Sequence, residues 1–524
     1  MGANLFDSGW DVAASRQRSG DAYVSDRDEL FRRRLSEARA FGAASEQLST
    51  QRPEFSARWG LNAKQRIIGF LLFIGYCVWV YLAAASAINV LAIAVAIAFG
   101  LIIAMRFGTV IAALIRKRPP EARRLRNDEL PMLTILVPLY REAEVVANLI
   151  AAISQLDYPV WRLDVKLLVE ADDPETIAVI EKLHLPACFE IIPVPLGAPR
   201  TKPKALNYAL AFVRGDIIAI YDAEDLPAPE QPRAAMEAFL RGPGNLAVVQ
   251  APLQIHNGEA SWLSAQFALE YAIHFRVWLP LLAQLKLPVP LGGTSNYFRR
   301  DMLIEVGGWD AWNVTEDADI GLRLARFGYT AGMVTPPTLE EAPMQWRQWR
   351  NQRTRWMKGH LQTWLVLNRH PLRAMRDMGV LNYLSTHLTL GGGLLAAILH
   401  GPLYIWIAAN LFVFRNVEPW HWIMFIAGYA SAVAAALASG SKHARPWILL
   451  TMLAYWPLQS WTMLRALVEM KLKPHFWAKT QHGVSFTSDR PSPIPPPPAD
   501  NVIQLEFPFA APPDAATRQL ADRR

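Results

Sequence analysis

The longest apolar stretches of the chain form two blocks, one on each side of a more polar central region. In the first block, residues 67–115 are interrupted by a single charge, Arg106. A membrane-spanning helix needs about 20 residues, so this run predicts two transmembrane helices at residues 63–115, joined near Ala84, Ala85 and Ser86. Basic residues flank both outer ends, which predicts that these ends and the region that follows are cytoplasmic.

The second block contains apolar runs at residues 380–414, 421–438 and 446–467. If the first run folds back at Gly401 and Pro402, residues 378–467 form four transmembrane helices and return the chain to the cytoplasm. Outside the two blocks, residues 1–62 carry scattered charge and predict a cytosolic, partly disordered region. Clustered prolines predict a disordered tail at residues 487–524.

Short β-rich runs alternate with helical segments between the two blocks. They lie at residues 134–138, 165–170, 190–194, 217–221 and 247–255. This alternation predicts an α/β domain with a mostly parallel, doubly wound sheet, which we expect at residues 128–370. Ligands bind such sheets at the carboxyl ends of the strands. Polar side chains follow three of these strands, namely Tyr140 and Glu142, then Asp172 and Asp173, then Asp222, Glu224 and Asp225.

The composition indicates a protein that is partly embedded in a bilayer. Of the 524 residues, 52% are hydrophobic, and the mean hydropathy is +0.12. The net charge is +7, but the basic residues cluster beside the apolar runs and form no stripe with interleaved aromatic residues. Membrane topology explains this pattern better than nucleic-acid binding does. We therefore expect the lipid bilayer as a partner, and no nucleic acid.

One strand end carries three carboxylates in close succession: Asp222, Glu224 and Asp225. Such concentrated negative charge is costly unless a cation lies beside it. Mg²⁺ and Mn²⁺ prefer carboxylate oxygens and also bind phosphate, so this stretch suits a divalent cation that carries a nucleotide diphosphate. A solvated acidic turn is the alternative explanation.

Two predicted helix starts carry further candidate chemistry. Lys204 lies near the start of one helix, where its charge and the amino end of the helix could hold a phosphate; an ordinary solvated lysine is the alternative. Thr315, Glu316 and Asp317 open another helix, with Thr315 placed to cap it. Capping alone could explain these residue types. In a partly enclosed site, however, Asp317 could accept a proton from an incoming hydroxyl as a general base.

The segment Gln345–Trp356 reads QWRQWRNQRTRW. If it is helical, Gln352 and Arg355 lie on one face, while Arg353 and Trp356 lie on another. Amphipathic helices with Trp beside Arg often lie in the plane of the membrane surface, so we expect an interface helix at about residues 343–362. Membrane anchoring alone is the alternative to a role in binding.

In their order along the chain, these stretches resemble the processive membrane glycosyltransferases of family 2, which include bacterial cellulose, hyaluronan and poly-N-acetylglucosamine synthases. The matching motifs are VPLYRE at 137–142, ADD at 171–173, KALN at 204–207, DAED at 222–225, TED at 315–317 and QRTRW at 352–356. Each motif is weak by itself, but six in the same order are specific. The resemblance implies a Rossmann-like GT-A fold, a UDP-sugar donor and inversion of the anomeric centre.

The resemblance also implies roles for individual residues. Asp317 would be the catalytic base, and Glu316 and Trp356 would bind the acceptor. The nucleotide and its diphosphate would contact Tyr140, Glu142, Asp172, Asp173, Lys204, Gln352 and Arg355. Asp222 and Glu224 would hold Mg²⁺ or Mn²⁺. Asp225 is an alternative ligand, because this chain has Asp-Ala-Glu where the family usually has Asp-x-Asp.

A weaker match is FWAKTQHG at residues 476–483, which is similar to the mobile loop that closes over the nucleotide in these synthases. The resemblance implies a gating loop at residues 470–486 that uses Lys479, Thr480 and His482. A basic and aromatic membrane anchor is the alternative.

Together, these features predict an inverting β-glycosyltransferase of the bacterial inner membrane. It would add sugars to a growing polysaccharide at the cytoplasmic face, with export subunits as candidate partners. The nearest rival is the same chemistry on a lipid acceptor, such as a polyprenyl phosphate or a glycolipid. A rival of another class is a non-catalytic transport or scaffold protein.

Overall fold

The structure is a computed structural model, and it describes residues 26–115, 124–183, 185–414 and 419–477. The expected gating residues Lys479, Thr480 and His482 lie outside the described residues, as does the expected tail at residues 487–524.

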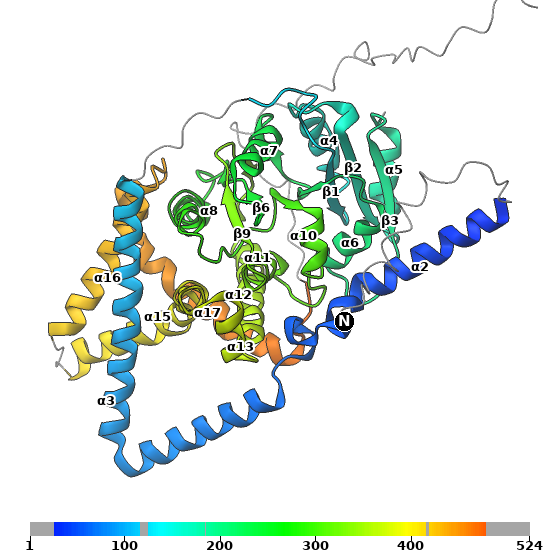
Figure 1. The fold of residues 1–524 in the computed structure, drawn as a ribbon. Helices are drawn as coiled ribbons and strands as arrows, with labels where there is room; N and C mark the ends of the chain where they lie inside the picture. The colour runs from blue at the N-terminus through cyan, green and yellow to red at the C-terminus, as the bar shows by residue number, and fades with distance from the viewer. Residues whose placement is uncertain (1–25, 116–123, 184, 415–418, 478–524) are drawn as a thin grey trace, which may run out of the picture.

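A seven-stranded sheet with the order β3-β2-β1-β4-β8-β6-β9 forms the centre of the polar region (Figure 1). β8 runs antiparallel to both of its neighbours, and the other pairs are parallel. The strands are β1 (Leu133–Leu139), β2 (Leu163–Glu170), β3 (Phe189–Val194), β4 (Ile217–Ile220), β6 (Leu246–Gln250), β8 (Asn296–Arg299) and β9 (Thr330–Met333). The predicted fold class, a mostly parallel α/β sheet, is therefore confirmed.

A second, three-stranded sheet contains β5 (Leu226–Pro227), β10 (Thr338–Glu340) and β7 (Leu253–Ile255). The single strand predicted at residues 247–255 is thus wrong, because the structure divides it into β6 and β7. Pro252 lies in the break and has no backbone N–H to donate to a sheet ladder. The sequence reasoning did not predict β8, β9 or β10.

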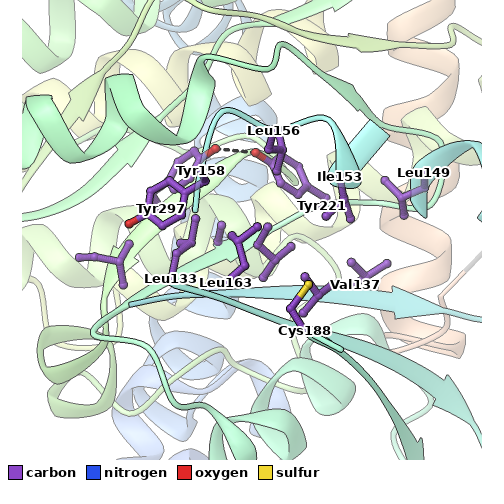
Figure 2. Packing of buried hydrophobic residues seen from close by; sticks show 14 of the residues in the cluster. Leu133, Val137, Leu149, Ile153, Leu156, Tyr158, Leu163, Cys188, Tyr221 and Tyr297 are labelled. Carbon is purple, nitrogen blue, oxygen red and sulfur yellow. Dashed lines mark hydrogen bonds between the residues drawn. The ribbon is translucent and has the colours of Figure 1, made fainter. Parts of the chain in front are cut away.

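Helices cover both faces of the large sheet. They are α4 (Val146–Ser154), α5 (Pro174–Lys182), α6 (Lys202–Ala209), α7 (Gln231–Arg241), α9 (Leu279–Gln284), α10 (Arg300–Glu305) and α11 (Glu316–Arg326). α8 (Trp262–Ile273) packs on β7 of the small sheet. Side chains alternate along β1, so Leu133 and Val137 enter one core and Leu136 enters the other. Figure 2 shows part of the first core, where Tyr221 and Tyr297 share a 2.5 Å hydrogen bond.

The N-terminal helix α2 (Asp26–Gln51) lies along α6 (Figure 1). Ala40, Ala44 and Leu48 are buried, and the ring of Phe41 rests on Gly197, where a Cβ atom would lie 2.3 Å from the ring. The later part of the N-terminal region is therefore packed on the α/β domain.

The first apolar block forms α3 (Ala63–Ile115), which bends sharply at Ala83. Ala83 has φ −152° and ψ 63°, so two helical arms meet there, next to the expected joint at residues 84–86. The second arm packs against α16 (Pro419–Ala438). Among the described residues, three helical stretches are long and apolar enough to cross a membrane: Ala63–Ile115, Val380–Val413 and Pro419–Ala438.

The expected fold at Gly401 and Pro402 is wrong. The stretch Val380–Val413 is one helical run that includes α14 (Val380–Thr386), η7 (His387–Gly391) and α15 (Gly392–Ala409), with Pro402 inside α15; η8 (Asn410–Phe414) follows α15. The last run forms α17 (Pro446–Leu472), which was expected to span the membrane but is not among the three stretches just named. Its carboxyl half carries Arg465, Glu469 and Lys471.

The amphipathic segment forms α12 (Trp346–Leu367), followed by α13 (Pro371–Met378). α12 packs along α17, and its residues Trp349, Arg353 and Lys358 are buried. The helix therefore lies between the α/β domain and the C-terminal helices. Membrane-surface anchoring explains only its exposed end at Trp346, which is 40% exposed.

Candidate active site

A cavity of about 940 Å³ lies at the carboxyl ends of β1, β2 and β4 and continues between α3, α15, α16 and α17. Nine of the predicted site residues line it: Tyr140, Glu142, Asp222, Glu224, Glu316, Asp317, Gln352, Arg355 and Trp356. Two of the three predicted strand-end groups therefore meet at this cavity, namely Tyr140 with Glu142 and Asp222 with Glu224. Asp172, Asp173, Lys204 and Asp225 do not line this cavity.

Glu316 and Asp317 enter the cavity from the first turn of α11. Burial raises the pKa of Asp317, although the Ala318 amide donates a 2.8 Å hydrogen bond to its carboxylate. Burial and the charge of Asp317 raise the pKa of Glu316 to about 8. Burial therefore favours the protonated form of Glu316, which can donate a hydrogen bond, and Asp317 is the candidate proton acceptor.

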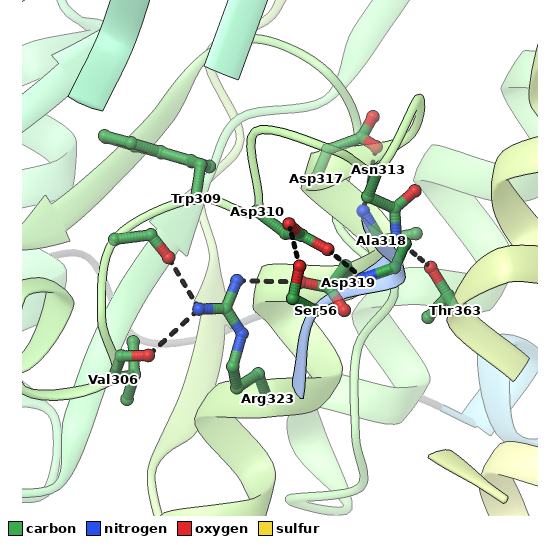
Figure 3. Close-up of polar contacts among 12 residues, drawn as sticks. Ser56, Val306, Trp309, Asp310, Asn313, Asp317, Ala318, Asp319, Arg323 and Thr363 are labelled. Carbon is green, nitrogen blue, oxygen red and sulfur yellow. Dashed lines mark hydrogen bonds and ion pairs between the residues drawn. The ribbon is translucent and has the colours of Figure 1, made fainter. Parts of the chain in front are cut away.

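Hydrogen bonds hold the loop before Asp317 in place (Figure 3). Arg323 donates to the carbonyl oxygens of Val306 and Gly308, at 2.9 and 2.7 Å, and to Asp319 at 2.7 Å. Asp310 accepts a 2.9 Å hydrogen bond from Ser56 of the N-terminal segment. These contacts, and not a side-chain cap, fix the start of α11.

The expected cap at Thr315 is wrong, because its side chain accepts no capping hydrogen bond. Thr315 instead lies against Gly359 of α12, where a Cβ atom would be 2.3 Å from its Oγ1. Asn313 also donates a 2.8 Å hydrogen bond to Thr363 of α12. The absence of a side chain at Gly359 therefore lets α12 approach the loop that carries Glu316 and Asp317.

Asp222 and Glu224 line the same cavity from the turn after β4. Burial and the charge of Asp222 raise the pKa of Glu224 to about 8. Burial and the charges of Glu224 and Asp222 also raise the pKa of Glu340, at the end of β10. The crowding of these carboxyl groups makes the site favourable for a cation.

The residues present fit a divalent cation that arrives with its substrate. Within the described ranges, no three His, Cys, Asp or Glu side chains are arranged to hold a metal ion by themselves. Mg²⁺ is commonly bound through only one or two carboxylates, with phosphate oxygens and waters completing its shell. Asp222 and Glu224 supply two such carboxylates beside a cavity that is large enough for phosphates.

Lys202 is the lysine that reaches the cavity. Its Nζ pairs with Asp222 and donates a 2.7 Å hydrogen bond to the carbonyl oxygen of Gly293. Burial alone would lower the pKa of Lys202, but attraction by Asp222 and Glu316 outweighs burial and raises it. Lys202 therefore carries a positive charge between the metal-type carboxylates and the start of α11.

Lys204, the lysine chosen from the sequence, is fully buried and lies 3.2 Å from Glu170. Sequence reasoning missed Lys202 because two lysines separated by one proline are equivalent until the backbone direction is known. The nearby Arg200 also lines the cavity and pairs with Asp172 at 2.5 Å.

The other two acidic residues outside the cavity have structural partners. Asp173 caps α5 by accepting from the Thr176 amide at 3.2 Å, and it also accepts from the Arg141 amide. Asp225 accepts from the Asp222 amide at 2.7 Å and from Thr294. Asp225 thus shapes the turn that presents Asp222.

Gln352, Arg355 and Trp356 enter the cavity from α12. Arg355 donates a 3.2 Å hydrogen bond to the Val314 carbonyl and lies 4.4 Å from the ring of Trp477. The Oε1 atom of Gln352 is buried without a hydrogen-bond partner in the described structure. These side chains leave polar atoms available to a ligand close to Asp317.

Arg353, beside them, holds the aromatic wall together. It forms two hydrogen bonds with Glu270, at 2.7 and 2.6 Å, and lies 4.7 Å from the Trp356 ring. Trp356 in turn stacks with Tyr271 at a centroid distance of 6.1 Å. The sequence pattern placed Arg353 and Trp356 on one face correctly but did not assign Arg353 a role.

The sequence of the α/β domain is similar to those of known proteins. The family model described as "Glycosyltransferase like family 2" matches residues 131–359. A probable glycosyltransferase of Bacillus subtilis, YdaM, is 27% identical over 44% of this chain and 56% of its own length. A β-monoglucosyldiacylglycerol synthase of Synechocystis is 26% identical over 45% of this chain and 49% of its own length.

A probable glucomannan 4-β-mannosyltransferase of Oryza sativa is 26% identical over 48% of this chain and 46% of its own length. The chain therefore spans about half the length of these relatives. The family match covers the sheet, α11 and the first part of α12. All charged residues that line the cavity, except Arg106, lie within the match. Residues 131–359 thus match the family 2 glycosyltransferases.

Proposed function

We propose that this protein transfers a sugar from a nucleotide diphosphate sugar to a hydroxyl group of a lipid acceptor at the cytoplasmic face of a bacterial inner membrane. One observation carries the proposal: a single cavity joins Asp317 and the carboxylates of Asp222 and Glu224 to apolar walls on the membrane-type helices. A donor and an amphiphilic acceptor could occupy the two ends of this cavity together.

The residues at the charged end suit an inverting single displacement. Asp317 accepts the proton of the acceptor hydroxyl, whose oxygen attacks the anomeric carbon from the face opposite the diphosphate. The bond to the diphosphate breaks, and Lys202 and Arg355 lie where they would attract its negative charge. A divalent cation at Asp222 and Glu224 would neutralise further charge on the diphosphate. In its protonated form, which burial favours, Glu316 would donate a hydrogen bond to the acceptor.

The far end of the cavity favours a lipid over a bare glycan. Ile102, Met105, Leu394, Ala397 and Ala432 line it with aliphatic groups. These groups offer a sugar hydroxyl no hydrogen bond, and burying such hydroxyls without partners is unfavourable. The similarity to a β-monoglucosyldiacylglycerol synthase supports the same acceptor class.

Extension of a polysaccharide is the second candidate. Trp356, Tyr271, Tyr455 and Trp456 give the middle of the cavity aromatic surfaces, on which sugar rings can stack. The similarity to a glucomannan mannosyltransferase supports this candidate.

Nucleotide release from a panel of UDP- and GDP-sugars tests the proposal. The full chain would be assayed with Mn²⁺ in dodecyl maltoside, with and without dioctanoylglycerol. We expect at least one donor to release nucleotide several times faster when the lipid is present. Release that no lipid or oligosaccharide accelerates, for any donor, would contradict the proposal and favour a non-catalytic role.

A further inference from the structure

One charged residue in the apolar part of the cavity has no role in the chemistry described above. Arg106 lies on the second arm of α3, half-buried, and lines the cavity. Ile102, Met105 and Thr109 line it as well. With Arg106 they follow the i, i+3, i+4 and i+7 spacing of one helical face. The guanidinium group therefore belongs to the cavity face of α3.

Arg106 has no counter-ion in the part of the chain that the structure describes. Among the residues that the structure describes, no hydrogen bond or ion pair involves it, and no carboxylate acts on it electrostatically. His400 of α15, which also lines the cavity, feels the charge of Arg106. An unpaired cation among apolar helices is costly, so such a residue indicates a site for an anion.

The position of Arg106 along α3 suggests the depth of this site in a membrane. The uncharged part of the second arm, Ala84–Met105, is about 33 Å long at 1.5 Å per residue. That length is close to the roughly 30 Å thickness of the hydrocarbon core of a bilayer. Arg106, the next residue, then lies at the boundary where lipid phosphates are found.

The helices that form the apolar part of the cavity pack closely against one another. Phe99, two turns earlier on α3, packs edge-to-face on His400 at 5.8 Å, and the His400 ring stacks on Trp456 at 5.2 Å. Gly392 lies against Ile102, where a Cβ atom would be 3.2 Å away. Arg106 thus lines a closely packed, mostly apolar part of the cavity, and the same cavity continues to the charged end.

We propose that Arg106 binds the phosphate of a lipid acceptor whose hydrocarbon chains occupy the apolar end of the cavity and whose free hydroxyl reaches Asp317. The inference rests on the proposed lipid acceptor and specifies it as an anionic one. The phosphate serves for recognition only, and the attacking group is a separate hydroxyl. Thr109 and His400 are the neighbouring polar side chains on the same cavity wall.

Direct binding tests the proposal without relying on transfer. Isothermal titration of the full chain in dodecyl maltoside, which contains no phosphate, would compare dioctanoyl phosphatidic acid with dioctanoylglycerol and inorganic phosphate. These two lipids have the same acyl chains and differ in the phosphate. We expect phosphatidic acid to bind most tightly, and Arg106→Gln to weaken its binding by about tenfold or more. Arg106→Lys, which keeps the charge, should restore most of the affinity.

Arg66→Gln provides a matched control, because it removes the same charge from an exposed position on the other arm of α3. We expect it to bind phosphatidic acid like the unmodified protein. Unchanged binding by Arg106→Gln would overturn the proposal, as would equal losses of both lipids, which would indicate a structural role. Inorganic phosphate binding as tightly as phosphatidic acid would reduce the site to a free-anion site and would also overturn it.

The two proposals fail in different ways. If Arg106→Gln binds phosphatidic acid normally while lipid still accelerates nucleotide release, only the anionic recognition is wrong. If no lipid accelerates release, the lipid acceptor itself is wrong, whatever Arg106 binds.

Discussion

The two ends of the cavity treat charge in opposite ways. At the sheet end, Asp222 pairs with Lys202, and Asp317 lies near Arg355 and beside Glu316, whose pKa is raised by burial and by the charge of Asp317. At the helix end, Arg106 has no counter-ion among the described residues. Under the proposed function, the sheet end stabilises charge that develops during the reaction, whereas the helix end offers one charge to a bound molecule.

This difference matters because both ends belong to one compartment. The residues that match the family 2 model contribute the side chains of the sheet end. α3 and α15 lie outside the matched residues and supply the apolar walls. We therefore expect the chemistry to depend on the matched domain and the choice of acceptor to depend on the helices outside it. Changes at the two ends should consequently affect different steps.

The largest effect is expected from Asp317→Asn. Loss of the proton acceptor should reduce transfer by about 10²- to 10⁴-fold and leave donor affinity within about threefold. Kinetics with saturating donor and a separate nucleotide-binding titration would measure the two quantities. Asp301→Asn, at an exposed position in α10, is the matched control and should keep full activity. Full transfer by Asp317→Asn would remove this residue from the mechanism.

The next largest effect is expected at the cation site. Asp222→Asn combined with Glu224→Gln should lower transfer by about 10²-fold and remove most of the stabilisation that Mn²⁺ gives in the presence of nucleoside diphosphate. Activity and thermal unfolding, each with and without Mn²⁺, would show this. If the double variant still responds to Mn²⁺ as the unmodified protein does, the cation binds elsewhere.

Filling the apolar end should block the acceptor while sparing the donor. Ala397 is 3% exposed and lines the cavity, so Ala397→Phe should reduce lipid-stimulated nucleotide release by about tenfold. Basal release without lipid should stay within twofold. Ala408→Phe makes the same change at an exposed position of α15 and should do neither. Equal loss of basal and stimulated release would show that the change disturbs the fold and not acceptor binding.

Trp356 lies where the two ends meet, so its removal should affect acceptor binding more than chemistry. Trp356→Ala should raise the acceptor KM by about tenfold and lower kcat by less, because the ring offers a stacking surface and no reacting group. Trp346→Ala, on the exposed end of α12, should leave both constants unchanged. A loss confined to kcat would assign Trp356 a part in the chemical step.

The pH dependence should be the smallest of these effects. Because burial raises the pKa of Asp317, activity should fall on acidification at a higher pH than the usual Asp pKa of about 3.9. The folded state also binds this proton more tightly than the unfolded state, so the group contributes stability at low pH that is lost as pH rises through the folded-state pKa. Asp317→Asn should therefore be as stable as the unmodified protein at neutral pH, or more stable. Marked destabilisation of that variant at neutral pH would contradict this sign.

The sequence was sufficient for five of the seven strands of the large sheet and for most of the candidate site residues at its edge. Buried parallel strands such as LTILVPL are almost entirely apolar, and the carboxyl ends of parallel strands necessarily share an edge. That reasoning brought Tyr140, Asp222 and Glu224 together correctly. It failed where the backbone direction decides, as with Lys202 and Lys204, and where a short antiparallel strand such as β8 has too few residues for a pattern.

The helices were predicted less well, because hydropathy reports length and not the path of the chain. We expected the chain to turn back at Pro402, but a proline inside an apolar helix is tolerated where neighbouring helices pack around it. The contacts of Arg353 with Glu270 and of Gly359 with Thr315 join distant segments, so no local pattern could predict them. The cavity that runs from the sheet into the helices is a property of that packing.

The most direct test of the central claim is the product formed from a labelled donor. The full chain would be incubated in dodecyl maltoside with the active radiolabelled donor and dioctanoyl phosphatidylglycerol, which carries both a phosphate and free hydroxyls. The account predicts one organic-soluble, singly glycosylated lipid, which is absent with Asp317→Asn and reduced by about tenfold with Arg106→Gln. A water-soluble ladder or high polymer that forms equally well without the lipid would contradict it.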